Sequence, residues 1–189
     1  LRRKLNLANY DILVLHKFFC NQDGSYNREI TVDEFCGAVS FDVCGFLDAQ
    51  FCLFGASEEY KRGKRITKRL NFPEFILFVV FFLTLDEAAL SRYWYVLLTD
   101  YQYNRFLVND KGHNDTPEGM LYNMKFLFGG PQTYWVEVAH YINDLGMLSH
   151  DHVTMSEFTR CCLTDQGQAV LLPIVSFQVD LQKRVMNRG

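Results

Sequence analysis

The sequence lacks the short motifs by which common enzyme active sites are recognised. It has no glycine-rich loop of the kind that cradles phosphate, no nucleophile elbow and no His-Glu-x-x-His pair for a catalytic zinc ion. The Gly129-Gly130-Pro131 turn is better explained as the end of a helix. We therefore expect a protein without enzyme activity.

A membrane-length apolar run and a strong excess of one charge are also missing. The apolar stretch from Phe75 to Leu85 is far shorter than the roughly 20 residues that a membrane-spanning helix needs. It predicts a helix buried on nearly all sides instead. The net charge of −3 gives no bias toward nucleic acid or membranes. We therefore expect protein partners, with no nucleic acid and no transmembrane segment.

Paired metal-binding cysteines are absent as well. None of the six cysteines forms a Cys-x-x-Cys pair, and most lie in apolar helical contexts, where cysteine packs as a small hydrophobe. The run from His150 to His152, taken with Cys161 and Cys162, lacks the paired spacing of a zinc site, so a polar turn and core cysteines explain it better. This cysteine usage predicts an intracellular location, with the cytoplasm or the cytoskeleton favoured and an organelle as the open alternative. No signal peptide is visible, and because Leu1 begins the chain we expect a processed product or part of a longer one.

Residues 23–35 have most of the layout of a calcium-binding loop. Calcium prefers oxygen ligands at positions 1, 3, 5, 7 and 9 of a twelve-residue loop, with a bidentate Glu at position 12. With Ile30 as the apolar eighth residue, the predicted ligands are Asp23, Ser25, Asn27, the backbone carbonyl of Glu29, Thr31 and Glu34.

Two features weaken this site. Only Asp23 and Glu34 bring a carboxylate to a ligand position, and Arg28 occupies the sixth position, where a glycine normally makes the sharp turn. Calcium could bind at this one site with low affinity or not at all. The alternative is a loop held by its own hydrogen bonds, with Asp23 acting as a cap.

The end of this loop recurs along the chain. The pattern apolar-x-x-x-Glu-Phe occurs at Ile30–Phe35, Leu70–Phe75 and Val153–Phe158, each time after a turn and before a predicted helix. The apolar residue is expected to pair across two loops, and the Phe to enter the core. A fourth turn near Tyr103–Leu107 fits by position.

The predicted fold is therefore all-α, with two pairs of helix-loop-helix units and a closing helix. The first pair covers residues 1–86, and the second pair with the closing helix covers residues 87–189. Helical periodicity predicts helices over residues 10–20, 33–39, 42–54, 73–85, 87–98, 120–128, 134–145, 155–163 and 170–185.

The residues of the other three loops predict that these loops bind calcium less well than the first. In the second, Glu74 lies too far from Phe54, and the insertion carries cations that repel a divalent ion, namely Lys61, Arg62, Lys64, Arg65, Lys68 and Arg69. The third loop fits residues 99–110 or 100–111, and neither register binds calcium well. The fourth keeps Glu157 but lacks oxygen ligands at its first and third positions.

The repeated pattern resembles the EF-hand superfamily over roughly residues 7–165. From Asn71 to Arg184 the chain is also similar to the B-double-prime regulatory subunits of protein phosphatase type 2A, on the segments Asn71–Phe75, Leu90–Tyr95 and Val153–Cys161. In that family this part is a pair of EF-hands with a closing helical segment. The resemblance implies the same fold here and a regulatory relationship to a larger complex.

Two functions fit these patterns. The first is an interaction or structural subunit of a larger assembly, such as a cytoskeletal, axonemal or organellar complex, with weak or vestigial calcium binding. The alternative is a calcium-sensing regulatory protein whose helix pair opens on binding. The candidate partner surfaces are the helix bearing Tyr93, Trp94 and Tyr95, the tail from Leu171 to Val185, and the basic insertion with Lys61, Arg62, Lys64 and Arg65. The insertion has the simpler alternative of a solvated loop.

Overall fold

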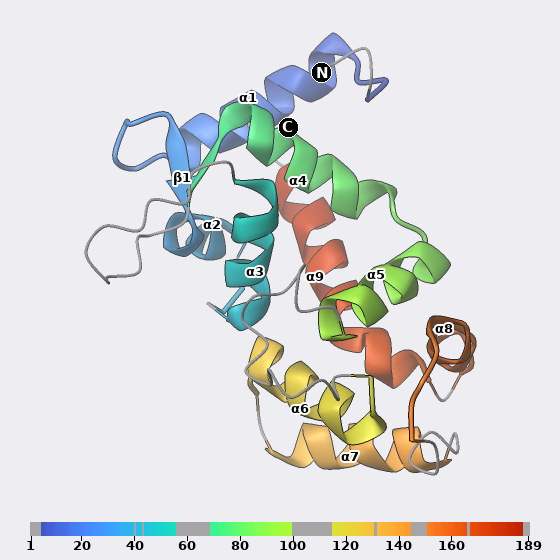
Figure 1. Ribbon diagram of the computed structural model, residues 1–189. Coiled ribbons are helices and arrows are strands. Elements are labelled where there is room, and N and C mark those ends of the chain that lie inside the picture. Colours follow the sequence, from blue (N-terminus) through green and yellow to red (C-terminus); the bar gives the residue numbers. More distant parts are fainter. Residues whose placement is uncertain are drawn as a thin grey trace. The chain divides into compact units, whose positions relative to one another are not determined.

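The computed structural model describes residues 5–39, 41–42, 44–55, 69–99, 115–130, 132–144, 151–165 and 167–186. This part of the chain is mostly helical, as predicted (Figure 1). Its helices are α1 (Asn9–Gln22), α2 (Val32–Val39), α3 (Gly45–Phe54), α4 (Phe72–Thr84), α5 (Glu87–Thr99), α6 (Pro117–Phe128), α7 (Gln132–Asp144), α8 (Met155–Cys162) and α9 (Gln168–Met186). Two short strands, β1 (Glu29–Thr31) and β2 (Arg69–Asn71), pair antiparallel. None of the described helices combines the length and apolar character needed to cross a membrane.

Helix α6 begins three residues before its predicted start. Turn-forming residues just before position 120, such as Asp115 and Pro117, favoured a later start. Instead, the Thr116 hydroxyl accepts a hydrogen bond from the Gly119 amide at 3.1 Å, and Pro117 occupies the first turn. The helix ends at Gly129, which has a φ of 62° and donates its amide to the Lys125 carbonyl at 2.8 Å. The prediction that this turn ends a helix is confirmed.

The chain divides into two compact units. The first comprises Leu1–Val43, Leu47–Thr84 and Phe177–Gly189, and the second comprises Cys44–Phe46 and Leu85–Ser176. The sequence had placed the whole closing helix with the second pair. The difference has a packing reason, because Phe177 on α9 is buried and its ring lies 5.1 Å from that of Phe82 in the first unit.

Aromatic side chains form much of the core of the first unit. Helix α4 buries Phe75, Phe78 and Phe82 at helical spacing, together with other apolar residues. The Phe78 ring lies within 6.1 Å, centre to centre, of five other rings, those of Phe35, Phe51, Phe54, Phe82 and Phe177. The expectation that α4 is buried on nearly all sides is too strong, because Leu77 is 39% exposed.

In the second unit, two aromatic side chains donate hydrogen bonds to backbone carbonyls of helix α9 near Pro173. Pro173 lies inside α9 and has no N–H to donate to the carbonyl of Ala169, four residues earlier. The Tyr134 hydroxyl from α7 donates to that carbonyl at 3.1 Å, and the Trp94 indole from α5 donates to the Val170 carbonyl at 3.2 Å. Burial, with a smaller effect of Glu137, raises the pKa of Tyr134 to about 12.

Candidate functional site: the first loop and its helix caps

Asp23, the first predicted calcium ligand, lies at the end of α1 and is only 8% exposed. One carboxylate oxygen, Oδ2, accepts a hydrogen bond from the Arg28 amide at 2.7 Å. The other, Oδ1, accepts from the Asn27 amide at 3.1 Å and from the Ser25 hydroxyl at 3.3 Å. Both oxygens are therefore engaged by the loop that an ion would occupy. This arrangement matches the alternative in which Asp23 caps the turn.

Glu34, the predicted closing ligand, caps the helix that follows the loop. Its Oε2 accepts hydrogen bonds from the Thr31 amide at 2.9 Å and the Thr31 hydroxyl at 3.0 Å, and the Glu34 amide donates back to that hydroxyl at 3.2 Å. This reciprocal arrangement is a capping box at the start of α2. The second oxygen, Oε1, lies near Gly24 at the start of the loop. A methyl group added at Gly24 would be 3.5 Å from this oxygen.

The loop backbone turns sharply at two residues that are not glycine. Tyr26 and Arg28 have φ angles of 53° and 67°. This left-handed region is disfavoured for residues with a Cβ by roughly 1–2 kcal/mol. Arg28 thus adopts the bend that glycine normally supplies at the sixth position, and the Asp23 carboxylate holds its amide in place.

The end of the first loop pairs with the end of the second. Strand β1 lies antiparallel to β2, with Ile30 opposite Leu70, as the sequence pattern predicts. Both side chains are fully buried. Across the two strands, Nη1 of the Arg69 guanidinium lies 3.4 Å from Oε2 of the Glu29 carboxylate, and both side chains are partly exposed. The ladder and its apolar pair hold the two loops together without using any predicted ligand side chain.

The glutamates of the other two signatures also cap helices. Glu74 Oε2 accepts from the Asn71 amide at 2.9 Å, and the Glu74 amide donates to Asn71 Oδ1 at 3.1 Å at the start of α4. Glu157 Oε2 accepts from the Thr154 amide at 2.9 Å and from the Thr154 hydroxyl at 2.7 Å at the start of α8. In all three signatures the Glu has one shared task, which is to complete a capping box.

The third loop lies almost wholly outside the described residues. Residues 100–114 hold all of the 100–111 register and all but Thr99 of the 99–110 register, so both registers stay predictions, as does the turn near Tyr103–Leu107. After these residues, the Val153 amide of the fourth loop donates to the Asp115 carbonyl at 2.8 Å, and Thr116 caps the start of α6.

The first loop offers the oxygen ligands that a hard cation prefers, but only two of these ligands are carboxylates. The six predicted ligands lie in one continuous loop and offer oxygen atoms, as calcium requires. Asp23 and Glu34 are the two ligand carboxylates, and both are engaged in hydrogen bonds within the chain. The described residues contain no group of three or more His, Cys, Asp or Glu suited to a metal ion. An ion would have to share these two carboxylates with the hydrogen bonds that they accept.

The predicted partner residues on α5 belong largely to the core. Trp94 has 0% exposure, and its ring lies 5.4 Å from that of Phe128. Tyr95 is partly buried, and its hydroxyl donates to the Val153 carbonyl at 2.7 Å. Burial, with smaller effects of Asp115 and Glu157, raises the pKa of Tyr95. Tyr93 is also partly covered. The prediction of an exposed aromatic surface here is wrong for Trp94, because Trp94 lies on the buried face of α5 with Leu90, Leu97 and Leu98.

The tail also turns its apolar face inward. The fully or nearly buried side chains of α9 are Val170, Leu171, Ile174, Phe177, Leu181 and Val185. Leu172 and Val179 remain exposed on the opposite side. The basic residues Lys61, Arg62, Lys64 and Arg65 lie outside the described residues, so that partner prediction stays a prediction.

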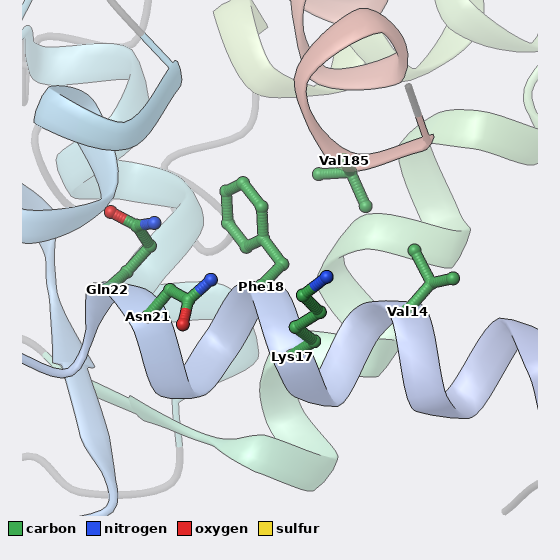
Figure 2. A pocket seen from close by; sticks show the side chains of 6 residues that line it. All are labelled: Val14, Lys17, Phe18, Asn21, Gln22 and Val185. Atoms are coloured by element: carbon green, nitrogen blue, oxygen red, sulfur yellow. The ribbon is translucent and has the colours of Figure 1, made fainter. Parts of the chain in front are cut away.

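A small hollow lies beside α1 in the first unit (Figure 2). Residues of α1 and Val185 of α9 line it, the α1 residues being Val14, Lys17, Phe18, Asn21 and Gln22. Its volume of about 20 Å³ leaves room for roughly one water molecule. Sites for small organic ligands are usually about 300 Å³ or larger. The hollow is therefore not a candidate ligand site.

Comparison of the chain with models of protein families, with curated proteins and with solved structures finds no match.

Proposed function

We propose that this chain is a non-catalytic, EF-hand-like subunit that binds a protein partner within a larger assembly, such as a cytoskeletal, axonemal or organellar complex. Its calcium binding is weak or vestigial. The observation that carries the proposal is the engagement of Asp23 and Glu34 by hydrogen bonds of the loop itself. The Asp23 carboxylate accepts three hydrogen bonds and the Glu34 carboxylate two, of the about four that a carboxylate can accept, so an ion gains less from them than from free carboxylates.

The EF-hand likeness is supported by three features of the first unit. Ile30 and Leu70 pair between two helix-loop-helix segments. Arg28 has the left-handed backbone that the sixth loop position needs. Helices α1 and α2 flank one loop, and α3 and α4 flank the other. A scaffold of this kind keeps its shape through apolar pairing and helix caps, so it can serve binding after the loop has lost its ion.

The partner contact is better placed on α6 than on α5. Tyr122 and Phe126 are 50% and 43% exposed and lie four residues apart, which puts them on one face of the helix. Single exposed apolar residues are ordinary on a protein surface. Two large ones on a single helix face are the kind of contact that an amphipathic helix of a partner uses.

The second candidate is a calcium-sensing regulatory protein, related to the phosphatase regulatory subunits that the second half of the sequence resembles. The observation that favours it is the bend at Arg28, because the loop already has the sharp turn of a calcium site. For this function, calcium would have to draw Glu34 out of its capping box, and α2 would change its position in response.

Calcium titration separates the two candidates. We expect no saturable heat signal for the wild-type chain at micromolar calcium, because only two ligand carboxylates are present and both are engaged. Arg28→Gly should leave any residual calcium affinity nearly unchanged, because Arg28 already has the left-handed backbone of the sixth loop position and its strain of about 1 kcal/mol does not change when an ion binds. Isothermal titration calorimetry on both proteins makes this measurement.

The matched control is Glu34→Gln, which removes the closing carboxylate but keeps an oxygen for the cap. Saturable binding in the wild type that this substitution abolishes would overturn the first candidate and favour the sensor. The absence of a saturable heat signal in the wild type, Arg28→Gly and Glu34→Gln would agree with a vestigial loop.

A further inference from the structure

One face of α6 carries two large aromatic side chains that point away from the core. Tyr122 and Phe126 are 50% and 43% exposed and lie one turn apart on the helix. The opposite face is held by a buried polar contact, in which Asn123 Nδ2 donates to the Leu98 carbonyl of α5 at 2.8 Å. The two exposed rings therefore lie on the outer face of α6, and not in an apolar groove between paired helices.

The ends of α6 keep this face in a fixed shape. Thr116 caps its first turn, and Gly129 ends it. The Trp135 indole of α7 donates to the Gly129 carbonyl, and α6 packs against α7 in the same unit (Figure 1). A surface that is already formed loses less entropy on binding than one that must first be ordered. The two rings therefore offer a preformed surface to a partner.

The unit that carries these rings is acidic. Its two segments, Cys44–Phe46 and Leu85–Ser176, contain 11 Asp or Glu residues against 5 Lys or Arg residues, a net charge of −6. The rest of the chain contains 11 Asp or Glu residues against 14 Lys or Arg residues, a net charge of +3. The small net charge of the whole chain therefore conceals a strong negative charge on the second unit.

The charged residues of α6 and α7 follow the same trend. Glu118 is exposed one turn before Tyr122, and Glu137 and Asp144 are exposed on α7. Lys125 is the only lysine or arginine within these two helices, and it is half-buried. The helix pair that carries the aromatic face is therefore mainly negative.

We infer that the outer face of α6 binds a basic amphipathic helix of a protein partner. Large apolar residues of that helix, spaced three and four apart, cover Tyr122 and Phe126. Its Lys and Arg side chains lie near Glu118, and the negative charge of the unit steers the encounter. The same charge repels anionic lipids and nucleic acid, which disfavours both as occupants of this face. The inference rests on the proposed function, since it specifies the chemistry of the partner.

Fluorescence anisotropy of a labelled peptide, titrated with the full chain, tests this inference. The probe is a helical peptide of about 18 residues made of Leu and Lys, with Leu at the i, i+3, i+4 and i+7 spacing of one helix face. We expect saturable binding in the presence of a calcium chelator, because the face is already formed. Tyr122→Ala and Phe126→Ala should each weaken binding about tenfold or more, as the loss of aromatic anchors does at interfaces. Glu118→Gln should weaken binding less and reduce its dependence on salt.

Tyr26→Ala and Asp33→Asn are the matched controls in the first unit. Tyr26 is 89% exposed and Asp33 is an exposed carboxylate, so neither substitution should change binding of the peptide. A second peptide with Glu in place of every Lys should not bind. Circular dichroism of every variant checks that the fold is kept, which is expected because the replaced side chains are exposed.

Three results would overturn the inference: no binding of the Lys peptide, equal binding of the Glu peptide, or unchanged binding in Tyr122→Ala and Phe126→Ala. A dimer of the chain alone that Tyr122→Ala dissociates in analytical ultracentrifugation would also overturn it, because a second copy would then occupy the face. The proposed function would survive these results, since it allows a partner elsewhere on the chain. Binding that depends on both rings but requires calcium would support this face and overturn the vestigial loop.

Discussion

Replacing Phe78 by alanine is expected to lower the free energy of unfolding by about 3–5 kcal/mol, the usual cost of a fully buried Phe. Phe78 is 0% exposed and sits among the rings of five other phenylalanines. The substitution removes the transfer energy of the side chain and leaves a cavity that rigid rings fill poorly. Urea unfolding followed by far-ultraviolet circular dichroism measures the change.

Leu77→Ala is the matched control for Phe78→Ala. It truncates the adjacent residue on the same helix, but Leu77 is 39% exposed, so the loss should stay below about 1 kcal/mol. If both substitutions cost the same, the assignment of Phe78 to the centre of the first unit would be wrong.

Trp94→Ala is expected to destabilise the second unit by about 3–5 kcal/mol. Trp94 is fully buried, its ring packs on that of Phe128, and its indole N–H serves the Val170 carbonyl beside Pro173. Truncation therefore leaves a cavity and also removes this hydrogen bond. Unfolding can be followed by the fluorescence of Trp135, the second tryptophan of the chain, which lies in the same unit.

Tyr122→Ala serves as the control for Trp94→Ala. Tyr122 is an aromatic residue of the same unit with 50% exposure, so its truncation should cost much less. A partner-surface role for Trp94 would give the reverse pattern, with little loss of stability and a loss of partner binding.

The helices could be predicted from the sequence because their apolar spacing is regular and their ends carry strong signals. The Ile30–Leu70 pairing was predictable too, since the apolar-x-x-x-Glu-Phe pattern fixes where each loop ends. The start of α6 was missed because its cap is Thr116 followed by Pro117, and the nearby turn-forming residues pointed to a longer loop.

The surface of α5 could not be predicted from spacing alone. Tyr93, Trp94 and Tyr95 are consecutive, so they point in different directions on a helix, and periodicity does not say which direction faces the core. Trp94 is buried because Phe46 and Phe128 approach it from distant parts of the sequence. Tertiary packing of this kind is invisible in a local pattern.

The role of the signature glutamates was ambiguous in the same way. In a calcium loop the twelfth residue binds the ion, and in a helix with a Thr or Asn cap three residues earlier it completes a capping box. Thr31 and Glu34 satisfy both patterns at once. The structure places Glu34 in the box, with Thr31 as its partner. The signature can therefore serve helix stability by itself.

Amide hydrogen exchange of the ladder residues tests the central claim most directly. The claim is that β1 and β2 are held by apolar pairing and helix caps, without an ion. We predict that the amides of Ile30 and Leu70 exchange slowly in the presence of a calcium chelator, and that adding calcium leaves their rates unchanged. Fast exchange in the chelator that becomes slow only when calcium is added would contradict this account.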